Sequence, residues 1–88
     1  MKIKIPSIFT LTAGDIDTIE VEGRNIGECL NAAQLKFPGI KIRLFNSQGQ
    51  LSEYLNYFLN NRKINDDDLE IQVGDEDEIS ILPVILGG

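Results

Sequence analysis

The sequence of 88 residues contains no histidine and no tryptophan, and it has only one cysteine, Cys29. Histidine is the side chain that most often transfers protons near neutral pH, so its absence argues against most enzyme chemistry. A single cysteine excludes an internal disulfide and a cysteine-held iron–sulfur cluster. The chain also lacks a run of about 20 apolar residues and a signal-peptide pattern. We therefore expect a cytoplasmic protein with no membrane partner.

Basic residues are scarce, since 8 Lys and Arg stand against 14 Asp and Glu and give a formal net charge of −6. Nucleic-acid affinity depends on clustered Lys and Arg, so we expect no nucleic-acid partner. Eight carboxylates lie within residues 66–78. Such a run either solubilises loops or attracts basic partner surfaces, and the sequence leaves both readings open. Neither Asp66–Asp68 nor Asp75–Asp77 starts a calcium loop with the required glycine and glutamate spacing, so we expect no metal site.

Most of the chain predicts short strands within one small domain. Apolar residues alternate in five segments, namely 2–9, 18–22, 40–45, 54–59 and 78–82. The first two should form an antiparallel hairpin through a turn at Ala13-Gly14-Asp15. Pro6 favours a sheet edge or a bulge, and Pro83 should end regular pairing in the last strand. Residues 69–73 read as a short strand or a turn.

One amphipathic helix separates the second and third strands. Asn25 is a suitable N-cap, Pro38-Gly39 should stop the helix, and one face carries the apolar residues Ile26, Cys29, Leu30, Ala33 and Phe37. This position makes Cys29 an ordinary buried residue rather than a reactive thiol. A hairpin, a helix and further strands indicate an α+β fold, with the last strand lying parallel beside the first.

Segment 54–59 alternates so that Leu55, Tyr57 and Leu59 face a core while Tyr54, Asn56 and Phe58 face outward. Phe58 and Leu82 would then form one apolar patch rimmed by the acidic residues, which we interpret as a partner-binding surface. A one-residue slip in the strand register would bury these two side chains instead, and the sequence leaves that alternative open.

The sequence ends with the apolar run 79–86 followed by Gly87-Gly88. Because glycine has no Cβ, such an ending can lie extended in a narrow channel of a partner. Together with three further segments, it resembles the ubiquitin-like β-grasp sulfur carriers related to the small subunit of molybdopterin synthase (MoaD) and the thiamine sulfur carrier (ThiS). The three segments are Ile5-Pro6-Ser7-Ile8, Phe37-Pro38-Gly39 and Leu59-Asn60-Asn61.

This resemblance implies a mixed sheet of about four to five strands packed on one main helix. It also implies a domain at 1–84 and a flexible C-terminal tail at 85–88. The Ile-Pro strand and the segment 51–61 look closer to the carriers that serve cysteine biosynthesis. Ile85 and Leu86 are bulkier than the residues often found before the glycines, which leaves the identity of the receiving enzyme open.

The resemblance further implies a carrier rather than an enzyme. An ATP-dependent adenylyltransferase of the MoeB/ThiF type would adenylate the Gly88 carboxylate, and a sulfur donor would convert it into a thiocarboxylate. The acceptor would be the large subunit of molybdopterin synthase, a cysteine synthase or a thiazole synthase. The chain itself would hold no cofactor, since ATP is used by the activating partner. The residues expected to bind partners are Gly87, Leu86, Ile85, Pro83, Leu82 and Phe58.

The sequence leaves two other functions open. The chain could be a ubiquitin-like modifier that is conjugated to other proteins through Gly88, because activation of the carboxylate is the same in both cases. It could also be an interaction domain without a covalent role, in which the terminal glycines have no function.

Overall fold

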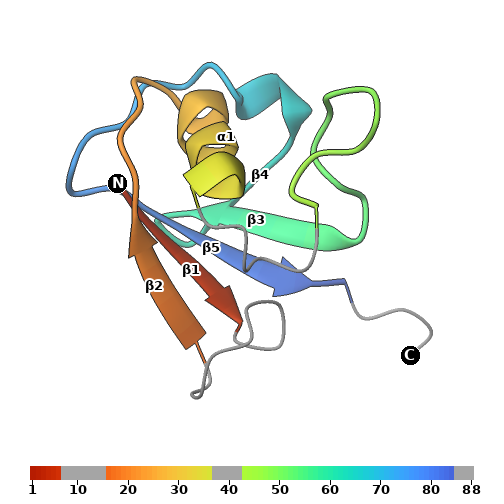
Figure 1. Cartoon of the computed structure of the whole chain (residues 1–88), viewed down its shortest axis with the longest axis horizontal. Helices are drawn as coiled ribbons and strands as arrows, with labels where there is room; N and C mark the ends of the chain where they lie inside the picture. Colours follow the sequence, from red (N-terminus) through yellow and green to blue (C-terminus); the bar gives the residue numbers. More distant parts are fainter. Residues whose placement is uncertain (7–15, 37–42, 85–88) are drawn as a thin grey trace.

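Alternating apolar residues build one mixed sheet, and a helix covers one of its faces (Figure 1). The computed structural model describes residues 1–6, 16–36 and 43–84. No helix in these segments is long and apolar enough to cross a membrane. The elements are β1 (Lys2–Pro6), β2 (Ile16–Glu20), α1 (Ile26–Lys36), β3 (Leu55–Leu59), β4 (Arg62–Ile64), the 3-10 helix η2 (Asp66–Asp68) and β5 (Glu78–Pro83).

The five strands lie in the order β2-β1-β5-β3-β4. β1 pairs antiparallel with β2 and parallel with β5, so Ile3 lies between Ile19 and Ile79. This confirms the predicted hairpin and the predicted parallel pairing of the first and last strands. β5 also pairs antiparallel with β3, with Ile79–Pro83 against Leu55–Leu59, and the regular register ends at Pro83 as expected. The turn predicted at residues 13–15 lies outside the described residues.

Pro6 does not place β1 at a sheet edge, because β1 lies between β2 and β5. The edge prediction was therefore wrong for the strand as a whole. The register of β1 with β5 covers only Lys2 to Lys4, whereas Pro6 lies opposite Ile16 of β2. Proline cannot donate a backbone hydrogen bond, so its position beyond the pairing with β5 leaves the central ladder intact.

The core lies between the sheet and α1. Its fully or almost fully buried side chains come from alternate strand positions and one helix face: Ile3, Ile5, Leu55, Tyr57, Ile64, Ile79, Ile81, Ile26, Cys29, Leu30 and Ala33. Leu59 is partly buried and packs against this cluster. The predicted register of β3 is therefore correct. Burial of each large aliphatic side chain stabilises the fold by about 1.5–3 kcal/mol, so these alternating positions fix which face of the sheet is inside.

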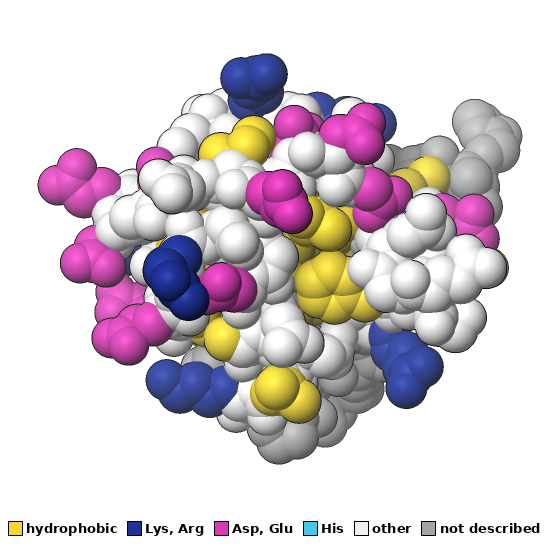
Figure 2. All heavy atoms as spheres, turned by 90° about the horizontal axis from the view of Figure 1, so that it is seen from above, with side chains coloured by type: hydrophobic (Ala, Val, Ile, Leu, Met, Phe, Trp, Pro, Cys, Tyr) yellow, Lys and Arg dark blue, Asp and Glu magenta, His cyan; other side chains and the backbone are white. Residues whose placement is uncertain are grey.

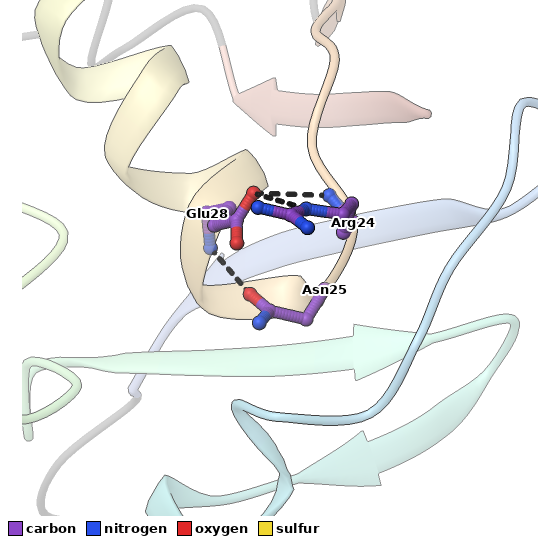
Figure 3. Close-up of polar contacts among 3 residues, drawn as sticks. All are labelled: Arg24, Asn25 and Glu28. Atoms are coloured by element: carbon purple, nitrogen blue, oxygen red, sulfur yellow. Dashed lines mark hydrogen bonds and ion pairs between the residues drawn. The ribbon is translucent and has the colours of Figure 1, made fainter.

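Asn25 caps α1 as predicted. Its Oδ1 accepts a hydrogen bond from the Glu28 backbone N–H at 2.8 Å, and Glu28 Oε1 accepts one from the Arg24 N–H at 3.2 Å (Figure 3). These bonds satisfy N–H groups that have no partner within the helix, which is worth about 1 kcal/mol. Phe37 and the predicted stop at Pro38-Gly39 lie outside the described residues.

The third predicted strand is wrong for residues 43–45, which form only an isolated bridge between Phe45 and Leu51; residues 40–42 lie outside the described part. Leu44 is fully buried, and its backbone N–H and carbonyl groups form hydrogen bonds with side chains that are distant in sequence. Its N–H donates to Gln34 Oε1 at 2.6 Å, and its carbonyl accepts from the Tyr57 hydroxyl at 2.6 Å. Burial raises the pKa of Tyr57 to about 12, so the hydroxyl keeps its proton and remains a donor.

The strand β4 was not predicted from the sequence. Asn60 and Asn61 both have positive φ angles, 48° and 73°, and they turn the chain back so that Arg62–Ile64 pairs with β3. Ile64 is the only apolar residue of this strand, which is too short to show a pattern. Residues 69–73 form a turn with one isolated bridge between Asn25 and Gln72, which agrees with one of the two readings.

Replacement of Tyr57 by Phe should lower the free energy of unfolding by about 1 kcal/mol, because it removes the buried hydroxyl that donates to Leu44. The Leu44 carbonyl keeps its bond from the Ser52 N–H at 3.1 Å, which limits the loss. Urea unfolding followed by circular dichroism measures the change. Tyr54→Phe is the matched control, since Tyr54 is 64% exposed and should be neutral. Equal stability of the two variants would contradict the assignment.

Candidate partner-binding face

The face of the sheet opposite α1 carries the side chains that alternate with the core. On β3 and β5 these are Asn56, Phe58, Ser80 and Leu82, and all are at least partly exposed. Phe58 lies opposite Ser80, and Asn56 lies opposite Leu82. Phe58 and Leu82 are therefore diagonal neighbours on one face, about 7–8 Å apart, within reach of large side chains. The predicted outward orientation of both residues is confirmed.

A third apolar residue, Tyr54, extends this surface toward the end of β5. Just beyond the last register pair, the Val84 N–H donates to the Tyr54 carbonyl at 3.0 Å, which holds Tyr54 beside the end of β5. Tyr54 is 64% exposed and Leu82 is 45% exposed, while Phe58 is half-buried. We call these three residues the outer patch. Large exposed apolar side chains that share a strand pair are typical of a docking surface.

The rim of the outer patch carries both charges rather than acidic residues alone: Glu78 is a diagonal neighbour of Phe58, and Glu53 and Asp66 line a hollow together with Asn56 and Lys63. In the register of the sheet, one row across the outer face reads Thr18, Lys4, Ser80, Phe58 and Lys63. Glu78 lies one row away, and its Oε1 is 3.0 Å from Lys4 Nζ. Lysines therefore stand in the same row as Phe58. Lys63 was not expected there because β4, which supplies it, was not predicted.

Acidic side chains are also numerous on the helix side of the molecule. Figure 2 shows the side on which α1 lies, with acidic side chains at one edge and across the face. Some of them support the fold: Asp66 Oδ1 accepts from the Leu51 N–H at 2.6 Å, and Asp77 accepts from Gly74 and Asn60. The hydrogen bonds from the Gly74 N–H and then the Asn60 amide lower the pKa of Asp77. Within residues 1–6, 16–36 and 43–84, three potential metal-ligating side chains nowhere come together.

Pro83 is exposed at the end of β5, opposite Leu55. β5 lies inside the sheet between β1 and β3, so its end is held on a rigid element. The other predicted site residues, Ile85, Leu86, Gly87 and Gly88, lie outside the described residues. The structure thus places Phe58, Leu82 and Pro83 on the strand pair that leads to the predicted tail, with Phe58 and Leu82 on the outer face and Pro83 opposite Leu55.

Cys29 is fully buried on the inner face of α1, as expected. Burial raises the pKa of its thiol, which favours the unreactive protonated form. A Cβ added to Gly23 would come within 2.8 Å of the Cys29 Sγ, so the chain packs tightly there. This environment fits a packing role.

A family model matches residues 4–88 and describes the ThiS family. The chain belongs to the ThiS family. Its members are small carrier or modifier proteins rather than catalysts. Among solved structures, the chain resembles one in the Amycolatopsis orientalis BexX/CysO complex, with 27% identity, a TM-score of 0.75 and coverage of 99% of this chain and 98% of that chain. A sequence comparison with curated proteins gives no significant match.

Two more distant structures share the fold. Mycobacterium tuberculosis CysO, an antigen, has 24% identity, a TM-score of 0.76 and coverage of 96% of this chain and 98% of that chain. The small archaeal modifier protein 1 from Methanosarcina acetivorans has 22% identity, a TM-score of 0.69 and coverage of 99% and 96%. These similarities and the five-stranded mixed sheet confirm the expected ubiquitin-like β-grasp fold.

Phe58→Asp should leave the protein folded, because the side chain lies on the outer face. Its neighbour Tyr57 is almost fully buried, so Tyr57→Asp should abolish the native state by placing a carboxylate in the core. Circular dichroism and thermal unfolding of the two variants test this contrast. Loss of the folded state in Phe58→Asp would show that Phe58 belongs to the core.

Cys29 should resist alkylation by iodoacetamide at pH 8 in the folded protein, because it is buried and its pKa is raised. The same thiol should react in full after denaturation in urea, which serves as the control. Intact-protein mass spectrometry measures both reactions. Rapid alkylation of the native protein would contradict a packing role.

Proposed function

We propose that this protein is a sulfur carrier whose Gly88 carboxylate is activated and converted into a thiocarboxylate. The observation that carries the proposal is the ThiS family match, which extends through residues 4–88 and includes Gly87 and Gly88. The 27% identical CysO chain, similar over nearly the whole length, supports it.

Chemically, an α-carboxyl group has a pKa of about 3.5 in peptides, so it is ionised near neutral pH and is a poor electrophile. In the proposed path, the carboxylate oxygen of Gly88 attacks the α-phosphorus of ATP, and pyrophosphate leaves. Hydrosulfide then attacks the carbonyl carbon of the acyl adenylate, and AMP leaves with the bridging oxygen. The product is a thiocarboxylic acid that loses its proton to become a sulfur nucleophile attached to a protein.

In this scheme the chain contributes recognition and a tether, while the partner binds ATP. The outer patch would dock on the partner, and the pairing of β5 with β1 and β3 would fix the point from which residues 85–88 extend. Glycines at the end would permit close approach of the partner's backbone. The activating partner would be an adenylyltransferase of the MoeB/ThiF type.

The proposal also names the enzyme that would accept the sulfur from Gly88. We favour a cysteine synthase over the large subunit of molybdopterin synthase or a thiazole synthase. The Ile5-Pro6 strand and the segment 51–61 resemble carriers that serve cysteine synthesis, and the 27% identical chain is a CysO.

Incubation with an adenylyltransferase of this type from the same organism, ATP and sulfide should increase the mass by the difference between sulfur and oxygen. Intact-protein mass spectrometry measures the shift, and deletion of Gly88 should abolish it. An unchanged mass, with an enzyme that is active on another carrier, would exclude the proposal and leave a conjugated modifier or an interaction domain.

A conjugated modifier is the second candidate, since the fold is shared with a small archaeal modifier protein. In that case the activated Gly88 carbonyl would form an isopeptide bond with a lysine amine, and AMP or the activating enzyme would be released. The same incubation with added cell extract would then yield species of higher mass that resist reducing agents. A carrier instead gives the thiocarboxylate alone.

A further inference from the structure

β2 is the outermost strand on one side of the sheet, and β1 is its neighbour on the other side (Figure 1). The strand at the opposite edge, β4, has only three residues, whereas β2 has five. An open strand edge carries backbone donors and acceptors that can pair with another chain. β2 is therefore the longer of the two edges at which this sheet could be extended.

The register with β1 shows which backbone groups of β2 are open. The Val21 N–H donates to the Met1 carbonyl at 3.0 Å, and the Met1 nitrogen donates to the Val21 carbonyl at 3.0 Å. In an antiparallel pair, residues that exchange two bonds alternate with residues that exchange none. Ile19 is thus the next bonded residue, and the backbone groups of Thr18 and Glu20 point away from β1. Within the described segments, no hydrogen bond reaches those groups.

A hollow of about 690 Å³ lies beside this edge, between the end of β2 and the helix. Residues 20–22 line it on the strand side, and Ala32 and Lys36 of α1 line it on the helix side. The exposed Leu35 follows Ala32 by three residues, so the two are neighbours on the helix surface. Ile19, on the same face of the sheet, is partly buried. A strand added beside β2 would find room and apolar contacts on its helix side.

The edge itself is acidic. Residues 15–22 contain four carboxylates and no Lys or Arg. Of these, Glu20 and Glu22 are exposed and border the hollow, which Asp75 also lines. Side chains of an added strand would lie about 4.5–5.5 Å from those directly opposite on β2. The carboxylates of β2 are thus the charges that such a strand meets first.

Three cations lie near the same edge, but none of them is on β2. Lys2 and the Met1 ammonium group lie on the β1 side, about one strand spacing of 4.7–4.9 Å further from an added strand. Lys36, on the helix, already has an interaction partner. Because electrostatic energy falls with distance, basic side chains on an added strand would be attracted to this edge.

We propose that the open edge of β2 binds an extended segment of a partner protein in which basic side chains alternate with apolar ones. The segment's backbone would pair with Thr18 and Glu20, its basic side chains would lie on the outer face near Glu20, and its apolar side chains would face α1 near Ala32. This inference goes beyond the proposed function, since Gly88 takes no part in it. β1 and β5 separate β2 from β3, so this segment and a partner bound at β3 can be held together.

A second copy of this chain fits the edge less well. Two β2 strands paired antiparallel around Ile19 would bring Glu20 and Glu22 of both chains to one seam. Each chain also carries a net charge of −6. Charged side chains on an edge strand discourage such self-pairing. A basic segment removes this repulsion, which is why the proposal commits to a different partner.

Hydrogen–deuterium exchange followed by NMR tests the edge directly. In the free protein, the amide hydrogens of Thr18 and Glu20 should exchange rapidly, whereas those of Ile19 and Val21 should be protected by their bonds to β1. A capped six-residue peptide of alternating lysine and valine should slow exchange at Thr18 and Glu20 by about 10-fold or more at saturation. The same peptide with glutamate in place of lysine should leave both rates unchanged.

Two methylated peptides separate strand pairing from charge attraction. A strand turns alternate N–H groups toward its neighbour, so methylation of the backbone nitrogens at the lysines or at the valines should abolish binding in one case only. Thr18→Pro removes an outward N–H but no bond to β1, so the variant should fold and should show no peptide protection at Glu20. Circular dichroism checks the fold.

Glu20→Lys should weaken binding of the lysine peptide by about 10-fold, because attraction becomes repulsion. Glu53→Lys is the matched control, since Glu53 is exposed, precedes β3 and gives the same change in net charge. Calorimetry measures both affinities. Equal losses in the two variants would show an effect of net charge alone and overturn the proposal.

Three other results would overturn it. They are slow exchange of Thr18 and Glu20 in dilute free protein, rates that do not change with peptide up to millimolar concentration, and equal effects of the two methylated peptides. Protection of these amides in concentrated protein without peptide would assign the edge to a second copy instead. The experiments use no enzyme, ATP or sulfide, so their failure leaves thiocarboxylate formation at Gly88 untouched.

Discussion

The pairing of β5 on both sides is the interaction on which the rest of the structure depends. β5 joins the hairpin of β1 and β2 to the pair β3 and β4, so the sheet is continuous only through this strand. Its alternation buries Ile79 and Ile81 completely and turns Ser80 and Leu82 outward. The same register therefore decides the core, the outer face and the direction in which the chain continues beyond Pro83.

In this arrangement, one face of a strand stabilises the core and the other face is available to bind a partner. Tyr57 is held in the core by packing and by a 2.6 Å hydrogen bond to Leu44, while Phe58, one residue later, lies on the outer face. A partner can therefore bind to β3 and β5 without disturbing the helix side of the sheet. The rigid strand pair also limits the entropy lost on binding, because the outer patch is ordered before a partner arrives.

The parts of the fold that alternate clearly were predictable from sequence, including the hairpin, the capped helix, and the faces of β3 and β5. The errors occurred where distant residues decide the conformation. Leu44 lies in an irregular segment because Gln34 and Tyr57, far away in sequence, satisfy its backbone. β4 contains only Ile64 as an apolar residue, and its pairing depends on two asparagines with positive φ angles. The first segment alternates as a strand would, so its pattern misled the prediction, and β4 is too short to show a pattern.

The candidate site shows the same limit in its electrostatics. Leu82 and Phe58 could be assigned to one outer face from alternation alone, but the charge around them could not, because it depends on which strand lies beside β3. The missed three-residue strand places Lys63 among the acidic residues that were expected there. Net charge describes how the whole molecule interacts over long distances, whereas a docking surface is governed by the few charges within about 10 Å that salt does not screen. The net charge of −6 therefore does not describe the surroundings of Phe58, where Lys63 lies directly opposite and Glu78 lies diagonally.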